Sequence, residues 1–123
     1  MKKILFIEDE ASLQKAVGDV LTEEEFEVIS ALDGEVGLRL AKDQKPDLIL
    51  LDLVMPKMNG IEVLKRLKEF EETKDIPVIV LTNSEEMEHI QQAIDLGATT
   101  YLVKINYKLD EVVEKIKGVL NAG

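Results

Sequence analysis

Cysteine is absent from this sequence of 123 residues, which excludes disulfide bonds and thiolate metal sites. Long apolar runs are absent too, because no stretch approaches the roughly 20 apolar residues that a membrane helix needs. Lys2 and Lys3 are followed by only four apolar residues before Glu8, far too few for the core of a signal peptide. We therefore expect a cytoplasmic protein that does not enter a membrane.

Positive charge is also scarce, since 15 Lys and Arg residues stand against 25 Asp and Glu residues and give a formal net charge of −10. Direct binding to nucleic acid would need clustered Lys and Arg, so it is not expected. Docking on anionic lipid is disfavoured for the same reason. The acidity favours cations and basic surfaces as partners, although a solvated surface rich in glutamate explains it equally well.

Strand-like and helix-like segments alternate five times, without a linker or an internal repeat. Short aliphatic runs are typical of strands buried on both faces, and apolar residues at helical spacing lie between them. The expected strands cover about 3–7, 26–31, 48–52, 77–81 and 100–103, and the expected helices about 13–21, 34–42, 60–70, 83–97 and 109–120. Five such units predict an α/β fold, with a doubly wound parallel sheet between two layers of helices. One domain is expected to span 1–123, with no residues left for an output module.

The helical pattern also predicts which side chains are buried. The fourth helix is expected to turn Met87, Ile90 and Ile94 inward and to end at Gly97, a typical glycine just beyond a helix C-terminus. The apolar stripe of the last helix begins at Leu109 and continues through Val112, Val113, Ile116 and Leu120. Gly18 lies inside the first helix, where glycine costs about 1 kcal/mol relative to alanine, and close helix packing is the expected reason.

Polar residues stand where the expected strands end. Glu8 and Asp9 follow the first strand, Asp52 closes the third, Thr82 follows the fourth and Lys104 the fifth. In a parallel sheet these side chains meet at one edge, where open α/β sheets bind ligands. Each residue alone has an ordinary structural explanation, as a cap or a surface charge. Their joint placement predicts a site.

The chemistry of these residues indicates phosphoryl transfer. Neighbouring carboxylates raise one another's pKa unless a cation is present, and Mg²⁺ is a hard cation that carboxylates and phosphate hold together. Asp52 can attack phosphorus and form an aspartyl phosphate. Lys104 and Thr82 can then hold the phosphoryl oxygens, while Glu8 and Asp9 bind the metal.

The chain resembles, over its whole length, the receiver domain of bacterial two-component response regulators. The matching pieces are the pair Glu8-Asp9, the segment Asp52-Leu53-Val54-Met55-Pro56-Lys57-Met58-Asn59-Gly60, Thr82 thirty residues after Asp52, and Tyr101 three residues before Lys104. The resemblance implies a flavodoxin-like sheet in the order 2-1-3-4-5, which is the order known for a member of this family.

The resemblance also implies a role for each site residue. Asp52 would accept a phosphoryl group from a sensor histidine kinase, a phosphotransfer protein or a small phosphodonor. Mg²⁺ or Mn²⁺ would be the only cofactor, bound by Glu8, Asp9, Asp52 and the backbone carbonyl of Val54.

A change of surface on phosphorylation is the expected output. Thr82 and Tyr101 would be the switch residues, and the fourth helix, fifth strand and fifth helix, at about 83–120, would bind a target protein. The family implies a signalling domain that phosphorylates and dephosphorylates itself, rather than an enzyme with a separate substrate. A monomer or a weak homodimer is expected.

Two positions depart from the usual family pattern. Glu8 stands where aspartate is frequent, which lengthens the side chain. Ile105 follows Lys104 where relatives usually carry a proline with a cis bond. A cis bond before another residue costs about 2.5–4 kcal/mol, so we expect a trans bond here.

Three other functions are alternatives to a phosphorylated receiver domain. A flavin or nucleotide carrier would need Gly, Ser and Thr at 8–10, where the sequence has Glu-Asp-Glu. A phosphatase with an aspartyl-phosphate intermediate would need a second carboxylate at Val54. A receiver-like scaffold that binds partners without phosphorylation is the main alternative, and the missing proline is its best support.

Overall fold

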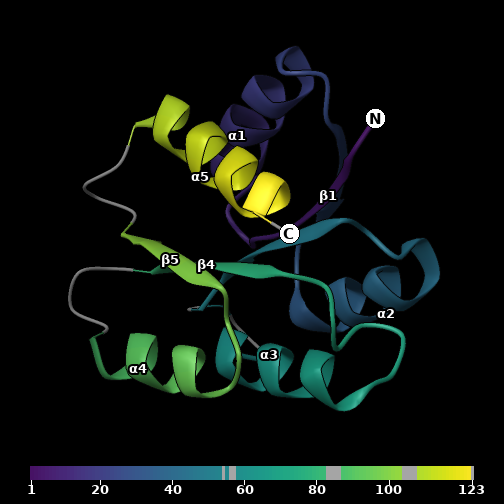
Figure 1. Cartoon of the computed structure of the whole chain (residues 1–123), viewed down its shortest axis with the longest axis vertical. Helices are drawn as coiled ribbons and strands as arrows, with labels where there is room; N and C mark the ends of the chain where they lie inside the picture. The colour runs from purple at the N-terminus through teal and green to yellow at the C-terminus, as the bar shows by residue number, and fades with distance from the viewer. Residues whose placement is uncertain (54, 56–57, 83–86, 104–107, 123) are drawn as a thin grey trace.

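The computed structural model describes residues 1–53, 55, 58–82, 87–103 and 108–122 (Figure 1). Strands and helices alternate along this part of the chain. In chain order they are β1 (Lys3–Ile7), α1 (Ala11–Glu23), β2 (Glu27–Ala31), α2 (Gly34–Gln44), β3 (Leu48–Asp52), α3 (Gly60–Glu69), β4 (Val78–Thr82), α4 (Met87–Asp95), β5 (Thr100–Val103) and α5 (Leu109–Ala122). Among these helices, none is long and apolar enough to cross a membrane.

The strands form one parallel sheet in the order β2-β1-β3-β4-β5, so the predicted fold and strand order are confirmed. Helices α1 and α5 cover one face of the sheet, and α2, α3 and α4 cover the other (Figure 1). Each connection therefore places the next strand parallel to the last, and all strands end at the same edge.

Two apolar cores result, one on each face of the sheet. Alternate residues of a strand point to opposite faces. Ile4 and Phe6 of β1 accordingly pack with α1 and α5, whereas Leu5 and Ile7 pack with α2 and α3. These four side chains are fully buried, because β1 is a central strand covered from both sides. This explains the unbroken aliphatic runs in the sequence.

The buried face of α4 differs from the prediction. Ile90 is buried as expected, but Ile94 is 41% exposed and Ala93 is only 1% exposed. The predicted inward position of Ile94 is therefore wrong, because the small Ala93 takes the place against the sheet. Gly97 has a φ of +106°, as expected for the glycine that follows a helix. The side chain of Met87 lies outside the described residues.

The glycines show one further difference from the prediction and one close contact that was not predicted. A Cβ at Gly18 would meet none of the described heavy atoms within 4 Å outside its own helix, so the prediction of close packing there is wrong. A Cβ at Gly37 would lie 2.6 Å from Cδ1 of Ile7, so this glycine does permit close packing of α2 on the sheet. The apolar pattern of α2 is weak because Gly34 and Gly37 occupy part of its buried face.

The last helix shows one smaller difference. Leu109, which was expected to begin its buried stripe, is 36% exposed at the first position of α5. Val112, Val113 and Ile116 are buried as predicted. The stripe is therefore confirmed from its second turn onward.

Candidate functional site

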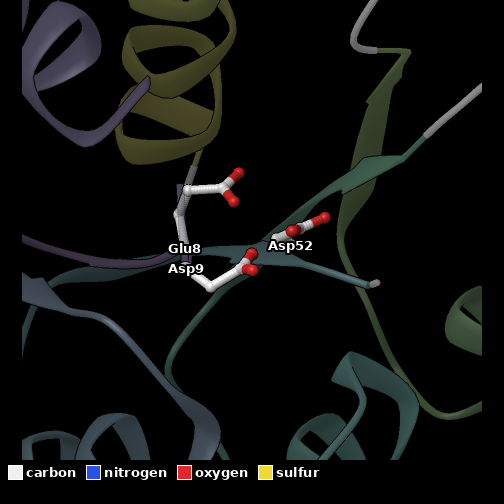
Figure 2. Close-up of side chains that lie close together, drawn as sticks. All are labelled: Glu8, Asp9 and Asp52. Atoms are coloured by element: carbon white, nitrogen blue, oxygen red, sulfur yellow. The ribbon is translucent and has the colours of Figure 1, made fainter. Parts of the chain in front are cut away.

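Three carboxylates meet where β1 and β3 end. Each of Glu8, Asp9 and Asp52 offers a ligand oxygen, and these oxygens lie within 4.8 Å of one another. Figure 2 shows the three side chains close together at the ends of these two neighbouring strands. Glu8 and Asp52 are 0% and 1% exposed, whereas Asp9 is exposed to solvent. The structure thus brings together the three carboxylates that the sequence pointed to.

Hydrogen bonds hold the turn that carries Glu8. The backbone N–H of Glu8 donates to the carbonyl of Ala31 at 3.0 Å, which ties the end of β1 to the end of β2. The backbone N–H of Glu10 donates to Oε2 of Glu8 at 3.2 Å. This second bond orients the carboxylate.

Gln14 is a site residue that the sequence analysis missed. It is only 7% exposed, and its Nε2 donates to the carbonyls of Phe6 at 2.8 Å, Glu8 at 3.2 Å and Ala31 at 2.9 Å. A single amide therefore cross-links α1 to the ends of β1 and β2. Its position three residues before the buried Val17 was the available signal, since it falls on the apolar face of α1.

The chain after Asp52 is held by α3. The backbone N–H of Leu53 donates to the carbonyl of Leu81 at 3.1 Å, and that of Gly60 donates to the carbonyl of Leu53 at 2.8 Å. Asn59 caps α3, because its Oδ1 accepts a hydrogen bond from the backbone N–H of Glu62 at 3.0 Å. The first turn of α3 therefore fixes the backbone beside Asp52.

The three carboxylates fit a hard divalent cation. The ligand oxygens lie within 4.8 Å of one another, and two like unit charges at that separation repel by about 3.5 kcal/mol at an effective dielectric constant of 20. A cation removes this repulsion, and Mg²⁺ favours one or two carboxylates with water in its remaining positions. The exposed Asp9 keeps the cluster in contact with solvent, which such an ion requires.

The other predicted residues are only partly described. β4 ends at Thr82, whose backbone pairs with Val103, but its side chain lies outside the described part of the chain. Val54, Lys104 and the bond between Lys104 and Ile105 lie outside it as well. Tyr101 lies on β5, where it pairs with Val80 of β4, and its side chain is 39% exposed.

Comparisons with known proteins all indicate the same family. The family model described as "Response regulator receiver domain" matches residues 4–117. Sporulation initiation phosphotransferase F of Bacillus subtilis is 34% identical, over 97% of this chain and 94% of that protein. The DNA-binding dual master transcriptional regulator RpaA of Synechocystis is 37% identical over 98% of this chain, which spans only 49% of its length.

Solved structures agree with this assignment. The Vibrio cholerae chemotaxis protein CheY4 superposes with a TM-score of 0.88 at 30% identity, over 95% of this chain and 97% of the other. Several of the curated relatives, including RpaA, are about twice as long as this chain, so the match concerns one domain of them. The strand order, the carboxylates at the strand ends and a family match over 4–117 agree: this chain belongs to the response regulator receiver domain family.

Proposed function

We propose that this receiver domain is a phosphorylation-dependent switch of a two-component system and that Asp52 accepts the phosphoryl group. The observation that carries the proposal is the cluster of Glu8, Asp9 and Asp52, whose oxygens lie within 4.8 Å at the carboxyl edge of the sheet. A buried acidic residue beside two further carboxylates has no packing role that would favour it over an apolar residue.

The proposed reaction transfers one phosphoryl group to Asp52. A carboxylate oxygen attacks phosphorus, a P–O bond forms, and the bond to the donor breaks with its electron pair leaving on the donor. A phosphohistidine of a kinase or a small acyl phosphate can be that donor. Mg²⁺ or Mn²⁺, held by Glu8, Asp9, Asp52 and the backbone carbonyl of Val54, would offset the charge on the transferring oxygens.

Lys104 and Thr82 are proposed to hold the phosphoryl oxygens once the transfer is complete. The new group adds nearly two negative charges, which attract a lysine ammonium and a threonine hydroxyl. Thr82 and Tyr101 would then change the surface formed by residues 83–120. The exposure of Tyr101 supports this part, because a ring that is 39% exposed can change what a partner meets on β5.

The partners follow from the same proposal. A sensor histidine kinase or a phosphotransfer protein would supply the phosphoryl group, and a target protein would bind 83–120. One relative is named a phosphotransferase, which supports exchange of phosphate between proteins. We do not propose direct binding to nucleic acid, because the net charge is −10. We further propose that one domain spans 1–123 and that the protein is cytoplasmic. It would be a monomer or a weak homodimer.

Intact mass spectrometry tests the proposal. Incubation with acetyl phosphate and Mg²⁺ should add one phosphoryl group, a gain of about 80 Da, and EDTA should prevent it. Asp52→Asn should show no gain, whereas Asp19→Asn, at a surface aspartate of α1, should behave as the parent. No gain in the parent with any donor would overturn the proposal and favour a scaffold that acts without phosphorylation.

A further inference from the structure

A groove opens between α2 and α3, and its lining residues do not include the three carboxylates of the cluster. These helices lie side by side on one face of the sheet (Figure 1), and the groove has a volume of about 420 Å³. Leu38, Met58 and Phe70 form its apolar lining. A volume of this size falls within the range of about 300–1,000 Å³ in which binding sites for ligands and short segments are found.

The groove is basic in an acidic protein. Arg39, Lys42 and Arg66 line it, and Glu35 is the one acidic residue among the described lining. Arg39 and Arg66 are the only arginines in the sequence, and one comes from each helix. The guanidinium group donates two parallel hydrogen bonds to a carboxylate, which a lysine ammonium cannot do. The two arginines therefore point to a ligand that carries carboxylates.

The existing ion pair in the groove does not oppose such a ligand. Nε of Arg66 lies 3.4 Å from Oε2 of Glu62, and their side chains are 49% and 45% exposed. An exposed pair of this kind contributes at most about 1 kcal/mol, so an incoming carboxylate can replace Glu62. Arg39 is exposed on the facing helix.

The position of Lys42 argues against a nucleotide. Its Nζ lies 3.4 Å from the ring centroid of Phe70 and covers one face of the ring. A base would have to displace Lys42 in order to stack there. Apolar side chains, in contrast, can pack on Leu38 and Met58 without displacing a charge.

We propose that the groove between α2 and α3 binds an acidic peptide segment of a partner protein, with apolar side chains in the groove and carboxylates on Arg39 and Arg66. This surface is separate from the 83–120 surface, and its use does not depend on phosphorylation of Asp52. Charge complementarity and the apolar lining carry the proposal together.

Selection from a phage-displayed library of random dodecapeptides, with the full chain as bait, tests the inference. The enriched peptides should combine Asp or Glu with large apolar residues. In a titration followed by NMR, the amides of Leu38, Arg39 and Arg66 should shift most. Arg39→Glu/Arg66→Glu should weaken the affinity of the selected peptide at least tenfold, and Arg39→Lys/Arg66→Lys should weaken it less.

Lys2→Glu/Lys65→Glu is the matched control, because it makes the same change of net charge at exposed lysines outside the groove and should keep the affinity. Circular dichroism checks that each variant is folded. Enrichment of no peptide or of basic peptides would overturn the proposal, as would equal affinity in the glutamate variant. Shifts in the groove on self-association, or with ADP alone, would identify a different occupant and would also overturn it.

Discussion

Gly60 lies directly against the backbone of Asp52. A Cβ at position 60 would overlap the carbonyl oxygen of Asp52 and the Cα of Leu53. The backbone N–H of Gly60 also donates to the carbonyl of Leu53 at 2.8 Å. Because backbone atoms cannot move aside as a flexible side chain can, the absence of a side chain at Gly60 fixes how closely α3 approaches the strand end that carries Asp52.

Gly60→Ala should therefore disturb both stability and the site. We expect the free energy of unfolding to fall by about 1–3 kcal/mol, the usual effect of an overpacked position. Phosphorylation by acetyl phosphate should also slow, because relief of the overlap moves the backbone of Asp52. Urea denaturation and time-resolved intact mass give the two values. An unchanged stability and rate would contradict the close contact.

Glu8→Gln and Asp9→Asn should each weaken binding of Mn²⁺ about tenfold or more, because each change removes a negatively charged ligand from the cluster. Electron paramagnetic resonance of Mn²⁺ gives the affinities. Mg²⁺ should also raise the thermal midpoint of the parent, since a ligand that binds only the folded state stabilises it. EDTA should reverse that rise.

Glu10→Gln is the matched control for the metal measurement. Its carboxylate accepts a hydrogen bond from the hydroxyl of Ser12 at 3.0 Å and is outside the cluster of three. Equal loss of affinity in this variant would show that general surface charge, rather than the cluster, attracts the metal.

Gln14→Leu should destabilise the fold by about 1–3 kcal/mol, because buried carbonyls at the ends of β1 and β2 lose their side-chain donor. Chemical denaturation measures the change. Gln92→Leu, at an exposed position of α4, should stay within about 0.5 kcal/mol of the parent. A weaker affinity for Mn²⁺ is also expected in Gln14→Leu, since the amide supports the backbone of Glu8.

The parallel sheet and the carboxylate cluster could be predicted from the residues because both depend on simple regularities, whereas the strand order came from the resemblance to receiver domains. Aliphatic strands such as Leu48–Asp52 end at one edge of a parallel sheet, and because β1 and β3 are neighbours there, the acidic residues at their ends lie close together. Gln14 was not predicted because a polar residue on a buried helix face has no periodic signature of its own. The inward position of Ile94 was predicted wrongly because hydrophobicity alone ranks isoleucine above Ala93, whereas packing against the sheet favoured the smaller residue.

Gly18→Ala should stabilise the protein by about 0.5–1 kcal/mol, because alanine forms helix better than glycine and the added methyl group meets none of the described neighbours. Thermal and urea denaturation measure this gain. Gly37→Ala should have the opposite effect, since its methyl group would press on the buried Ile7. Loss of stability in Gly18→Ala would show that this position of α1 needs its glycine for another reason.

Lys68 should titrate below the ordinary lysine value of 10.5. Burial lowers its pKa, and the charge of Asp75 opposes that change. Its Nζ donates to the carbonyls of Lys74 at 3.1 Å and Ile76 at 3.4 Å. NMR titration of the side chain should therefore show a pKa below 10.5, which falls further in Asp75→Asn. A value at or above 10.5 would contradict the effect of burial.

The lowered pKa of Lys68 also fixes the sign of a stability change with pH. Between its folded pKa and the unfolded value of 10.5, the unfolded chain binds more protons than the folded one. The contribution of Lys68 to the free energy of unfolding therefore rises as pH increases through this interval. Lys68→Met should remove that contribution, whereas Lys65→Met, at an exposed lysine of the same helix, should keep it. Denaturation curves of the two variants and the parent, measured at several pH values just below 10.5, separate the two outcomes.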